Sequence, residues 1–447
     1  MALPGKRRYA IRVVAAATVA LLAAVAVPAG PTPASPASSS STPQARPAQH
    51  VILFDFDGFD PRFVHGEYAG LADLPNLRAL IEEGSYGVAD GSFSSYSNSS
   101  RATTATGTYP ITHRNTGYYY SPETGRGVSQ ERHIEPGVET IAQSLRRQDR
   151  TAAYLQWYVV QGYGAVFGDP DALYTQPGGN CQTRADQAIA LLRGEPVDSG
   201  GTMVDPGRIP DLITVYCDDV DAVLHGDGFS AAGLPAALAR VDAQIGRVRE
   251  AAREAGILDE TAFVVTADHG ARDWTIPLLP EVVDRLAGTG LTVEVISSSG
   301  GVPDPASEIV VVAAPRTADI TLRGRADTPA QARNIARIIR SVPGIAAVYD
   351  ERDLRRMKAS DKLGDLVVEP IEPYHLSTLT DGKPRGSHGG LAEAYVPLVL
   401  SGAGIRAGVP LHDVGLVDVA ATISALLGVR PPTSSQGHVI RRAVERS

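Results

Sequence analysis

Five short segments of the chain carry side chains that can bind a metal ion or attack an electrophile, and four of them supply carboxylates and imidazoles. The six candidate metal ligands are Asp57, Asp221, His225, Asp268, His269 and His388. Three neutral imidazoles and three carboxylates are ligands that suit two Zn²⁺ ions, although another divalent metal would also be accepted. Two ions a few ångströms apart can bind both the attacking and the leaving oxygen of a phosphoryl displacement.

The fifth segment is a Ser/Thr-rich stretch at 97–107 that offers a nucleophile. A hydroxyl bound to a metal ion loses its proton near neutral pH, so Ser97 would become a usable nucleophile beside such ions. Each feature has an ordinary explanation alone, because an Asp-Gly pair is usually a turn and a Ser/Thr-rich run is usually a polar loop. Their occurrence together along one chain, mostly at strand ends, favours catalysis.

The elements that must position these residues alternate between strands and helices. Buried strands are expected at 51–54, 212–216, 262–266, 309–312 and 398–400, and helices at 74–83, 235–255 and 417–427. This alternation predicts an α/β fold with a large, mostly parallel central sheet flanked by helices. Three candidate segments follow directly after such strands, and ligands of open α/β sheets bind at the carboxyl ends of strands.

A different pattern interrupts this alternation. Strand 319–323, helix 329–341 and strand 345–349 predict a small α+β lobe, inserted at about 276–384 between two candidate site segments. We therefore expect residues 49–447 to form one large catalytic domain that carries this lobe.

The first 48 residues are expected to lie outside that domain. Residues 1–29 combine a basic start, a charge-free apolar run at 13–27 and small residues at its end, which is typical of a signal peptide. The run is shorter than the roughly 20 residues of a membrane-spanning helix, and no cysteine follows it, so no stable membrane anchor is expected. Residues 30–48, rich in Pro, Ser and Ala, predict a disordered spacer.

These N-terminal features predict a secreted or extracytoplasmic protein. Arg7-Arg8 is compatible with a twin-arginine signal or with the basic start of a Sec signal. The two cysteines, Cys181 and Cys217, allow one disulfide or two buried thiols, and both alternatives stay open because sequence contains no geometry.

Composition excludes several classes of protein. Of 447 residues, 43% are hydrophobic and 20% are charged, which is ordinary for a globular protein and excludes a disordered or collagen-like chain. The net charge of −9 becomes −13 without residues 1–29, which contain four basic and no acidic residues. An acidic chain disfavours nucleic-acid binding beyond possible nucleotide substrates. Composition contains no information on the oligomeric state.

The ordered set of segments resembles the alkaline phosphatase superfamily, and within it the type I phosphodiesterase/nucleotide pyrophosphatase branch. The resemblance covers about residues 49–435. The motifs that carry it are Val-Ile-Leu-Phe-Asp-Phe-Asp-Gly-Phe at 51–59, Leu-Pro-Asn-Leu-Arg-Ala-Leu at 74–80, Thr106-Gly107-Thr108-Tyr109-Pro110 with His113, Val-Val-Thr-Ala-Asp-His-Gly at 264–270, Gly-Ser-His-Gly at 386–389, Pro-Leu-Val-Leu-Ser-Gly at 397–402 and Val-Asp-Val-Ala at 417–420.

The resemblance implies two zinc sites and a covalent phosphoserine intermediate. One site would be formed by Asp221, His225 and His388, and the other by Asp57, Asp268, His269 and Ser97 Oγ. In this superfamily the nucleophile stands nine residues before the Thr of the Thr-Gly pair, a count that leads from Thr106 to Ser97. The nucleophile typically lies at a helix N-terminus, where amide donors favour an anion.

The chain departs from the branch's pattern around this nucleophile. The branch usually has Thr followed by an aromatic residue, Pro and Asn, whereas this chain has Ser97-Asn98-Ser99-Ser100. The branch's phosphate-binding Asn counts to Tyr118, so that contact is expected from Tyr118, from Asn115, or not at all. Arg101 is expected to grip phosphoryl oxygens with its guanidinium fork, or else to be an exposed residue of the following helix.

Asp55, two residues before Asp57, has three interpretations. It would be a third metal ligand, an acceptor for a metal-bound histidine, or a paired buried carboxylate.

Together these features predict a secreted, metal-dependent hydrolase of small phosphoric esters. Diesters and pyrophosphates are expected first, because no extra Lys/Arg pair near the site is evident to grip a doubly charged monoester. A phosphomonoesterase that uses Arg101 is the main alternative. A sulfatase comes third, because Ser99 stands where sulfatases have Pro and three histidines do not suit Ca²⁺. The non-enzymatic alternative is an inactive binding homologue, against which the complete ligand set argues.

Overall fold

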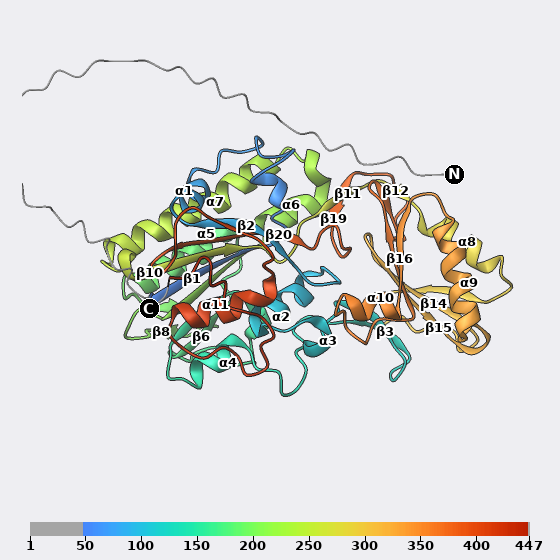
Figure 1. Ribbon diagram of the computed structural model, residues 1–447, viewed down its shortest axis with the longest axis horizontal. Coiled ribbons are helices and arrows are strands. Elements are labelled where there is room, and N and C mark those ends of the chain that lie inside the picture. The colour runs from blue at the N-terminus through green and yellow to red at the C-terminus, as the bar shows by residue number, and fades with distance from the viewer. Residues whose placement is uncertain (1–47, 446–447) are drawn as a thin grey trace, which may run out of the picture. The chain divides into compact units, whose positions relative to one another are not determined.

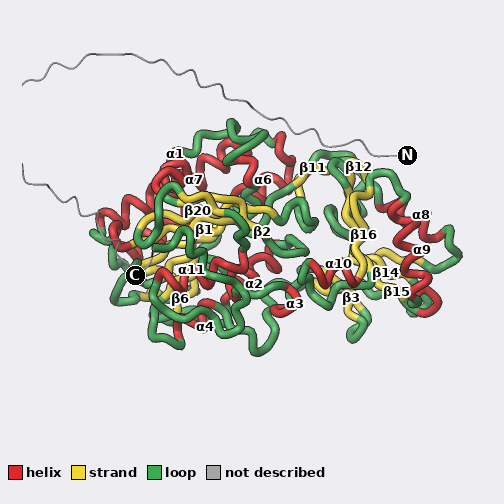
Figure 2. Tube along the Cα trace, in the orientation of Figure 1, coloured by secondary structure: helices red, strands yellow, loops and turns green. Residues whose placement is uncertain are grey.

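A computed structural model describes residues 48–445 (Figures 1 and 2). The expected signal peptide at 1–29 and the spacer up to residue 47 lie outside the described residues. Within 48–445, no helix combines the length and the apolar character that crossing a membrane requires.

An eight-stranded sheet forms the centre of the fold. Its strands are β1 (His50–Phe56), β2 (Ser85–Asp90), β5 (Ala152–Leu155), β6 (Ala172–Thr175), β9 (Leu212–Cys217), β10 (Thr261–Thr266), β20 (Tyr395–Gly402) and β21 (Val409–Leu411). The spatial order is β21-β2-β20-β10-β1-β9-β5-β6. The five strands from β10 to β6 are parallel, and β20 is antiparallel to both neighbours. The expected mostly parallel sheet is therefore confirmed.

The central strands are continuous apolar runs because both of their faces are covered. Every residue of β9 and β10 is buried, and in β1 only His50 is partly exposed. In β2, nearer the sheet's edge, buried positions alternate with exposed or half-buried ones. This contrast between central and outer strands is typical of a sheet with helices on both sides.

Helices pack on both faces of this sheet (Figure 1). One group is α1 (Pro75–Glu83), α5 (Cys181–Leu192), α6 (Asp219–Asp227) and α7 (Leu234–Glu254), and the other is α2 (Ser97–Thr106), α4 (Ile141–Arg146) and α11 (Val419–Leu426), with the short α3 (Pro110–His113) after α2. Cys181 at the start of α5 forms a disulfide with Cys217 at the end of β9, which decides between the two alternatives for the cysteines.

The segment expected to form an inserted lobe has its own sheet and its own hydrophobic core between Leu278 and Leu376. Its elements are α8 (Leu279–Ala287), β13 (Val293–Ile296), β14 (Ile309–Ala313), β15 (Ala318–Leu322), α9 (Pro329–Arg340), β16 (Ile345–Asp350), α10 (Glu351–Arg356) and β17 (Leu366–Pro370). The sheet order is β13-β14-β15-β17-β16. One expected buried strand, β14, thus belongs to this second sheet.

The fold also contains four short strand pairs. They are β3 (Tyr118–Ser121) with β4 (Arg126–Ser129), β7 (Val197–Asp198) with β8 (Met203–Val204), β11 (Arg272–Trp274) with β19 (Arg385–Ser387), and β12 (Ile276–Pro277) with β18 (Tyr374–His375). Pairing of Arg272 with Ser387 brings the chain that follows His269 beside the chain that precedes His388.

A buried histidine joins α2 to the loop after α3. His113 Nδ1 accepts a hydrogen bond from the Asn115 backbone N–H at 3.1 Å, so Nε2 carries the proton and donates to Thr103 Oγ1 at 2.9 Å. Burial lowers the pKa of His113 to about 3 from its ordinary value of 6.5. The ring is therefore held neutral in the fold.

We expect acid to reduce the difference in free energy of unfolding between the wild type and His113→Gln. Because the folded pKa lies below the unfolded one, the neutral ring stabilises the fold above pH 6.5, and this contribution is lost as the pH falls toward 3. From pH 7.5 to pH 5, the free energy of unfolding should fall by about 2 kcal/mol more in the wild type than in the variant. Urea unfolding at both pH values measures this, and an unchanged difference would mean that the ring is not buried in its neutral form.

Candidate active site

The candidate ligands meet at one edge of the central sheet. The neighbouring parallel strands β10, β1 and β9 end side by side, so the residues that follow them lie close together. Asp57 follows β1, Asp221 and His225 lie on α6 after β9, Asp268 and His269 follow β10, and His388 follows β19. All six residues enter two overlapping groups around this edge, together with Ser97 from α2.

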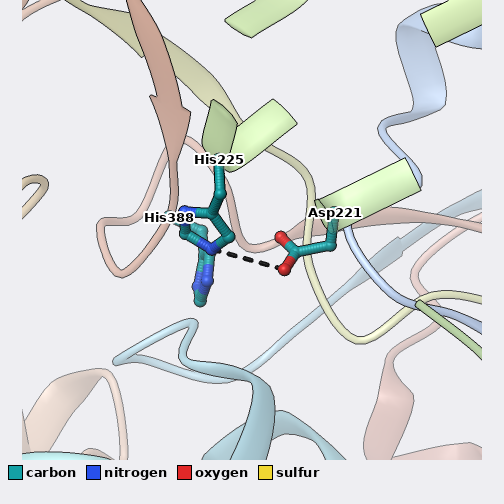
Figure 3. A group of neighbouring side chains, drawn as sticks. All are labelled: Asp221, His225 and His388. Carbon is teal, nitrogen blue, oxygen red and sulfur yellow. Dashed lines mark ion pairs between the residues drawn. The ribbon is translucent and has the colours of Figure 1, made fainter. Parts of the chain in front are cut away.

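The first group contains Asp221, His225 and His388 (Figure 3). Asp221 and His225 are one helical turn apart on α6 and therefore share a face, with His225 Nε2 3.3 Å from Asp221 Oδ2. The ring of His388 lies 5.3 Å from that of His225, and one ligand atom from each of the three residues lies within 4.8 Å of the others. His225 is exposed, so this side of the site opens to solvent.

The second group surrounds Nε2 of His269. This atom is 2.9 Å from Ser97 Oγ, 3.2 Å from Asp57 Oδ1 and 3.4 Å from Asp268 Oδ2. A tetrahedral zinc ion with bonds of about 2.0–2.1 Å keeps its ligand atoms roughly 3.3 Å apart. Asp57 Oδ1 is buried and accepts no hydrogen bond from the described residues. The spacing and this unpartnered oxygen both fit a bound divalent ion.

The two buried imidazoles both direct Nε2 toward these groups. Nδ1 of His269 donates to the carbonyl oxygen of Gly270, and Nδ1 of His388 donates to that of Ser95, each at 2.9 Å. Because a carbonyl oxygen only accepts, Nδ1 must carry the proton, which leaves Nε2 as the ligand atom. The rings of His269 and His388 stack 3.4 Å apart, and Asp221 also lies close to Asp57 and His269, so the two groups adjoin.

The electrostatics of the site favour added positive charge. Burial raises the pKa of Asp268 to about 7, and burial together with the nearby charge of Asp57 raises the pKa of Asp221 well above its ordinary value. Burial and the neighbouring His269 lower the pKa of His388, which keeps its ring in the neutral form that binds metals. Carboxylates this deep in the protein need a cation nearby.

For Asp57 and His269, charged neighbours shift the pKa in the opposite direction to burial, and the neighbours outweigh burial. Burial alone would raise the pKa of Asp57, but Arg101 and His269 outweigh it and hold that pKa well below its ordinary value. Burial would likewise lower the pKa of His269, but Asp268 and Asp57 raise it to about 10, so a metal ion at Nε2 would take the place of a proton there.

Ser97 is the first residue of α2, and the backbone of Tyr96 before it is extended. The amide groups of a helix's first turn have no carbonyl acceptor within the helix, and the helix dipole adds partial positive charge at that end. Ser97 is half-buried, with its hydroxyl directed at His269. The start of α2 is therefore suited to an anionic group beside the Ser97 hydroxyl.

The two expected phosphate-binding residues differ in position. The amide of Asn115 is buried, donates to the carbonyl oxygen of His133 and accepts from the Gly117 N–H, both at 3.1 Å, so both ends of the amide have partners within the protein. Tyr118 is half-buried at the start of β3, with its ring 4.8 Å from that of Tyr96, which in turn lies 5.9 Å from that of His388. Of the two, Tyr118 is the one with a link to the candidate metal ligands.

Arg101 has different partners from those expected. Its side chain has no exposed surface, so the interpretation as an exposed helix residue is wrong. The guanidinium pairs with Asp55, Asp57 and Asp268 because three buried carboxylates surround it. It is therefore turned toward the carboxylates, two of which are predicted metal ligands.

Three aromatic residues around these carboxylates were missed by the sequence analysis. The hydroxyl of Tyr216 donates to Asp57 Oδ2, and Trp157 Nε1 donates to Asp55 Oδ2 at 2.7 Å. The ring of Tyr158 lies beside Arg101. Only Tyr216 could have been predicted from the sequence, because it is the last residue of an expected strand. The loop that contains Trp157 and Tyr158 carries no motif. Asp55 is thus a paired buried carboxylate, one of its three interpretations.

Comparisons with known proteins give a family and a fold. The family model described as type I phosphodiesterase / nucleotide pyrophosphatase matches residues 51–391. No curated protein matches the chain in sequence. Among solved structures, murine ectonucleotide pyrophosphatase/phosphodiesterase 5 is similar with a TM-score of 0.64 and 17% identity, covering 87% of this chain and 97% of that chain.

Two further structures have the same fold. An inactive threonine-to-alanine variant of the murine protein, in complex with AMP, has a TM-score of 0.65 and 16% identity and covers 87% of this chain and 96% of that chain. The human protein has a TM-score of 0.64 and 15% identity, and the match covers 87% of this chain and 97% of that chain.

Proposed function

This chain belongs to the type I phosphodiesterase/nucleotide pyrophosphatase family and is a hydrolase of phosphoric ester bonds, and from this premise we propose that it cleaves small phosphodiesters or pyrophosphates at a two-zinc site. The observation that carries the proposal is the geometry around His269 Nε2, where the Ser97 hydroxyl and two carboxylate oxygens have the spacing of zinc ligands. The adjoining group on α6 supports a second ion.

The residues divide between the two ions as the family resemblance implies. Asp221, His225 and His388 would hold one ion, and Asp57, Asp268, His269 and Ser97 Oγ the other. When bound, the zinc ions supply positive charge that stabilises the deprotonated Ser97 hydroxyl and the oxygens of the phosphoryl group.

The residues of the chain then account for a two-step hydrolysis. Ser97 Oγ loses its proton to solvent and attacks phosphorus, the bond from phosphorus to the leaving oxygen breaks, and that oxygen takes a proton from solvent. Amide groups in the first turn of α2 donate to the phosphoryl oxygens as their charge develops. Water then attacks the phosphoserine, releases the phosphoryl product and restores the Ser97 hydroxyl.

The pairing of Arg101 with carboxylates supports diesters over monoesters as the substrates. A doubly charged monoester needs an additional cation, and the guanidinium closest to the predicted ligands is already paired with Asp57 and Asp268. The AMP bound in the murine relative supports nucleotides as the substrate class.

A side-by-side assay of one nitrophenyl diester, monoester and sulfate ester tests this proposal. We expect kcat/KM for the diester to exceed the other two by at least about tenfold, which corresponds to 1.4 kcal/mol in the transition state. A monoester preference would instead identify a phosphomonoesterase, and a sulfate preference a sulfatase. Zinc-loaded protein with no activity on any of the three would favour the inactive binding homologue.

We also propose that residues 1–29 direct export, that residues 30–48 act as a spacer and that the catalytic domain begins near residue 49. The Cys181–Cys217 disulfide supports export, because disulfides persist mainly in oxidising compartments.

A further inference from the structure

Arg101 is the cation at the centre of three buried carboxylates. Its terminal nitrogen Nη2 pairs with Asp57 Oδ2 and, at 2.7 Å, with Asp268 Oδ2, and Nε lies 3.4 Å from Asp55 Oδ2. Asp55, Asp57 and Asp268 are 2%, 4% and 1% exposed. A guanidinium in this position cannot leave for solvent or for a substrate without exposing these carboxylates to one another.

Two tyrosines hold the guanidinium in place. Its carbon lies 4.3 Å from the ring centre of Tyr216 and 5.2 Å from that of Tyr158, and Nη1 donates to the Tyr158 hydroxyl. Contacts of this kind between a cation and an aromatic face are strongest where water is excluded. The two adjacent rings and the hydrogen bond to the Tyr158 hydroxyl therefore restrict the orientation of Arg101.

The two oxygens of Asp57 have separate partners as a result. Oδ2 accepts hydrogen bonds from Arg101 and Tyr216, whereas Oδ1 accepts none from residues 48–445 and faces His269 Nε2. Arg101 thus leaves one oxygen of Asp57 free for an ion and prevents the carboxylate from turning.

The charges of the group are consistent with this arrangement. Three carboxylates removed from water require about three positive charges nearby. One divalent ion at Asp57, Asp268 and His269 supplies two, and Arg101 supplies the third. Asp55, which has no role as a ligand in this geometry, is the carboxylate that balances Arg101.

We propose that Arg101 is a positioning residue that holds Asp57 and Asp268 for one divalent ion and, together with Asp55, keeps the site neutral. This inference rests on the proposed two-metal function. It replaces the expectation that Arg101 grips the substrate, because the side chain acts through the ligands and has no surface open to a phosphoryl group.

Zinc affinity tests the proposal without an activity measurement. Chelator competition on full-length wild type and Arg101→Gln should show about 10- to 100-fold weaker binding of one zinc ion in the variant. Arg101→Lys, which keeps the charge but loses the fork, should fall between the two. The matched control is Arg184→Gln, because Arg184 is also fully buried, pairs with Asp218 and faces Tyr216, yet contacts no predicted ligand.

A double variant, Arg101→Gln with Asp55→Asn, covers the case in which Arg101→Gln folds poorly. Arg101→Gln leaves Asp55 unbalanced and should lower the thermal midpoint of the zinc-loaded protein by about 4–6 °C. Adding Asp55→Asn restores neutrality and should recover at least half of that loss, whereas Asp55→Asn should not improve Arg184→Gln.

The outcomes separate this inference from the proposed function. Wild type that binds no zinc would refute the two-zinc site itself. Wild type that binds zinc, with Arg101→Gln binding it equally well, would refute the positioning role alone. Equal zinc binding with a raised KM would instead restore Arg101 as a substrate contact, and equal weakening in Arg184→Gln would mean general loosening of the fold.

Discussion

Replacing Ser97 with alanine is expected to lower diester turnover by about 10³-fold or more. The Ser97 hydroxyl is 2.9 Å from His269 Nε2, and neighbouring hydroxyls are engaged elsewhere. Ser99 Oγ donates to the Asn115 carbonyl oxygen and Ser95 Oγ to that of Gly390, so neither can take over the attack without breaking a buried hydrogen bond. The variant should retain most of its zinc, since the other ligands are unchanged.

Two controls make the Ser97 result specific. Ser97→Thr keeps a hydroxyl at the same position and should retain measurable turnover, whereas Ser99→Ala removes the neighbouring hydroxyl and should leave the chemistry intact. Acid quenching during diester turnover should trap the phosphoryl group, still carrying its second ester, on Ser97 in the wild type and not in Ser97→Ala. Turnover that survives Ser97→Ala would place the nucleophile elsewhere.

Replacing His388 with alanine is expected to remove one zinc ion and to lower diester hydrolysis by at least about 10²-fold. His388 is the only member of the Asp221 and His225 group that comes from a separate segment, and its Nε2 is held toward the others by the Nδ1 hydrogen bond to Ser95. Without it, two ligands from one helix remain, which is too few for a structured zinc site.

Elemental analysis measures this directly, with about two zinc ions per chain expected in the wild type and about one in His388→Ala. His412→Ala is the matched control, because His412 is exposed and belongs to neither group of ligands. Removing zinc with a chelator should abolish wild-type activity, and added Zn²⁺ should restore it. Active protein free of divalent metal would overturn the mechanism.

Local sequence patterns predicted four strands of the central sheet, β1, β9, β10 and β20, and missed β2, β5, β6 and β21. The helix expected at 235–255 is α7 (Leu234–Glu254), and the strand expected at 262–266 is β10 (Thr261–Thr266). Such elements are readable because apolar periodicity reflects which face of a segment is buried. The four-residue spacing of Asp221 and His225 likewise predicts a shared helical face, and the structure has it.

Local patterns did not predict which of the two sheets a strand joins. The apolar run 309–312 looks like the central strands, but it pairs with β13 and β15 in the second sheet. A buried strand has the same composition in either sheet, so its neighbours depend on pairing between distant segments.

The partners of Arg101 show the same limit within the site. Its three carboxylates are separated from it by 46, 44 and 167 positions in the chain, and the stacking of His269 on His388 joins residues 119 apart. Residue types and spacing predicted the ligand segments as a set, and the family resemblance predicted Ser97 as the nucleophile, because motifs and strand ends are local. The direction in which Arg101 points, and hence whether it serves the substrate or the ligands, depends on which buried charges the folded chain places around it. A buried charge takes its partners from the whole tertiary environment, and no local pattern contains that information.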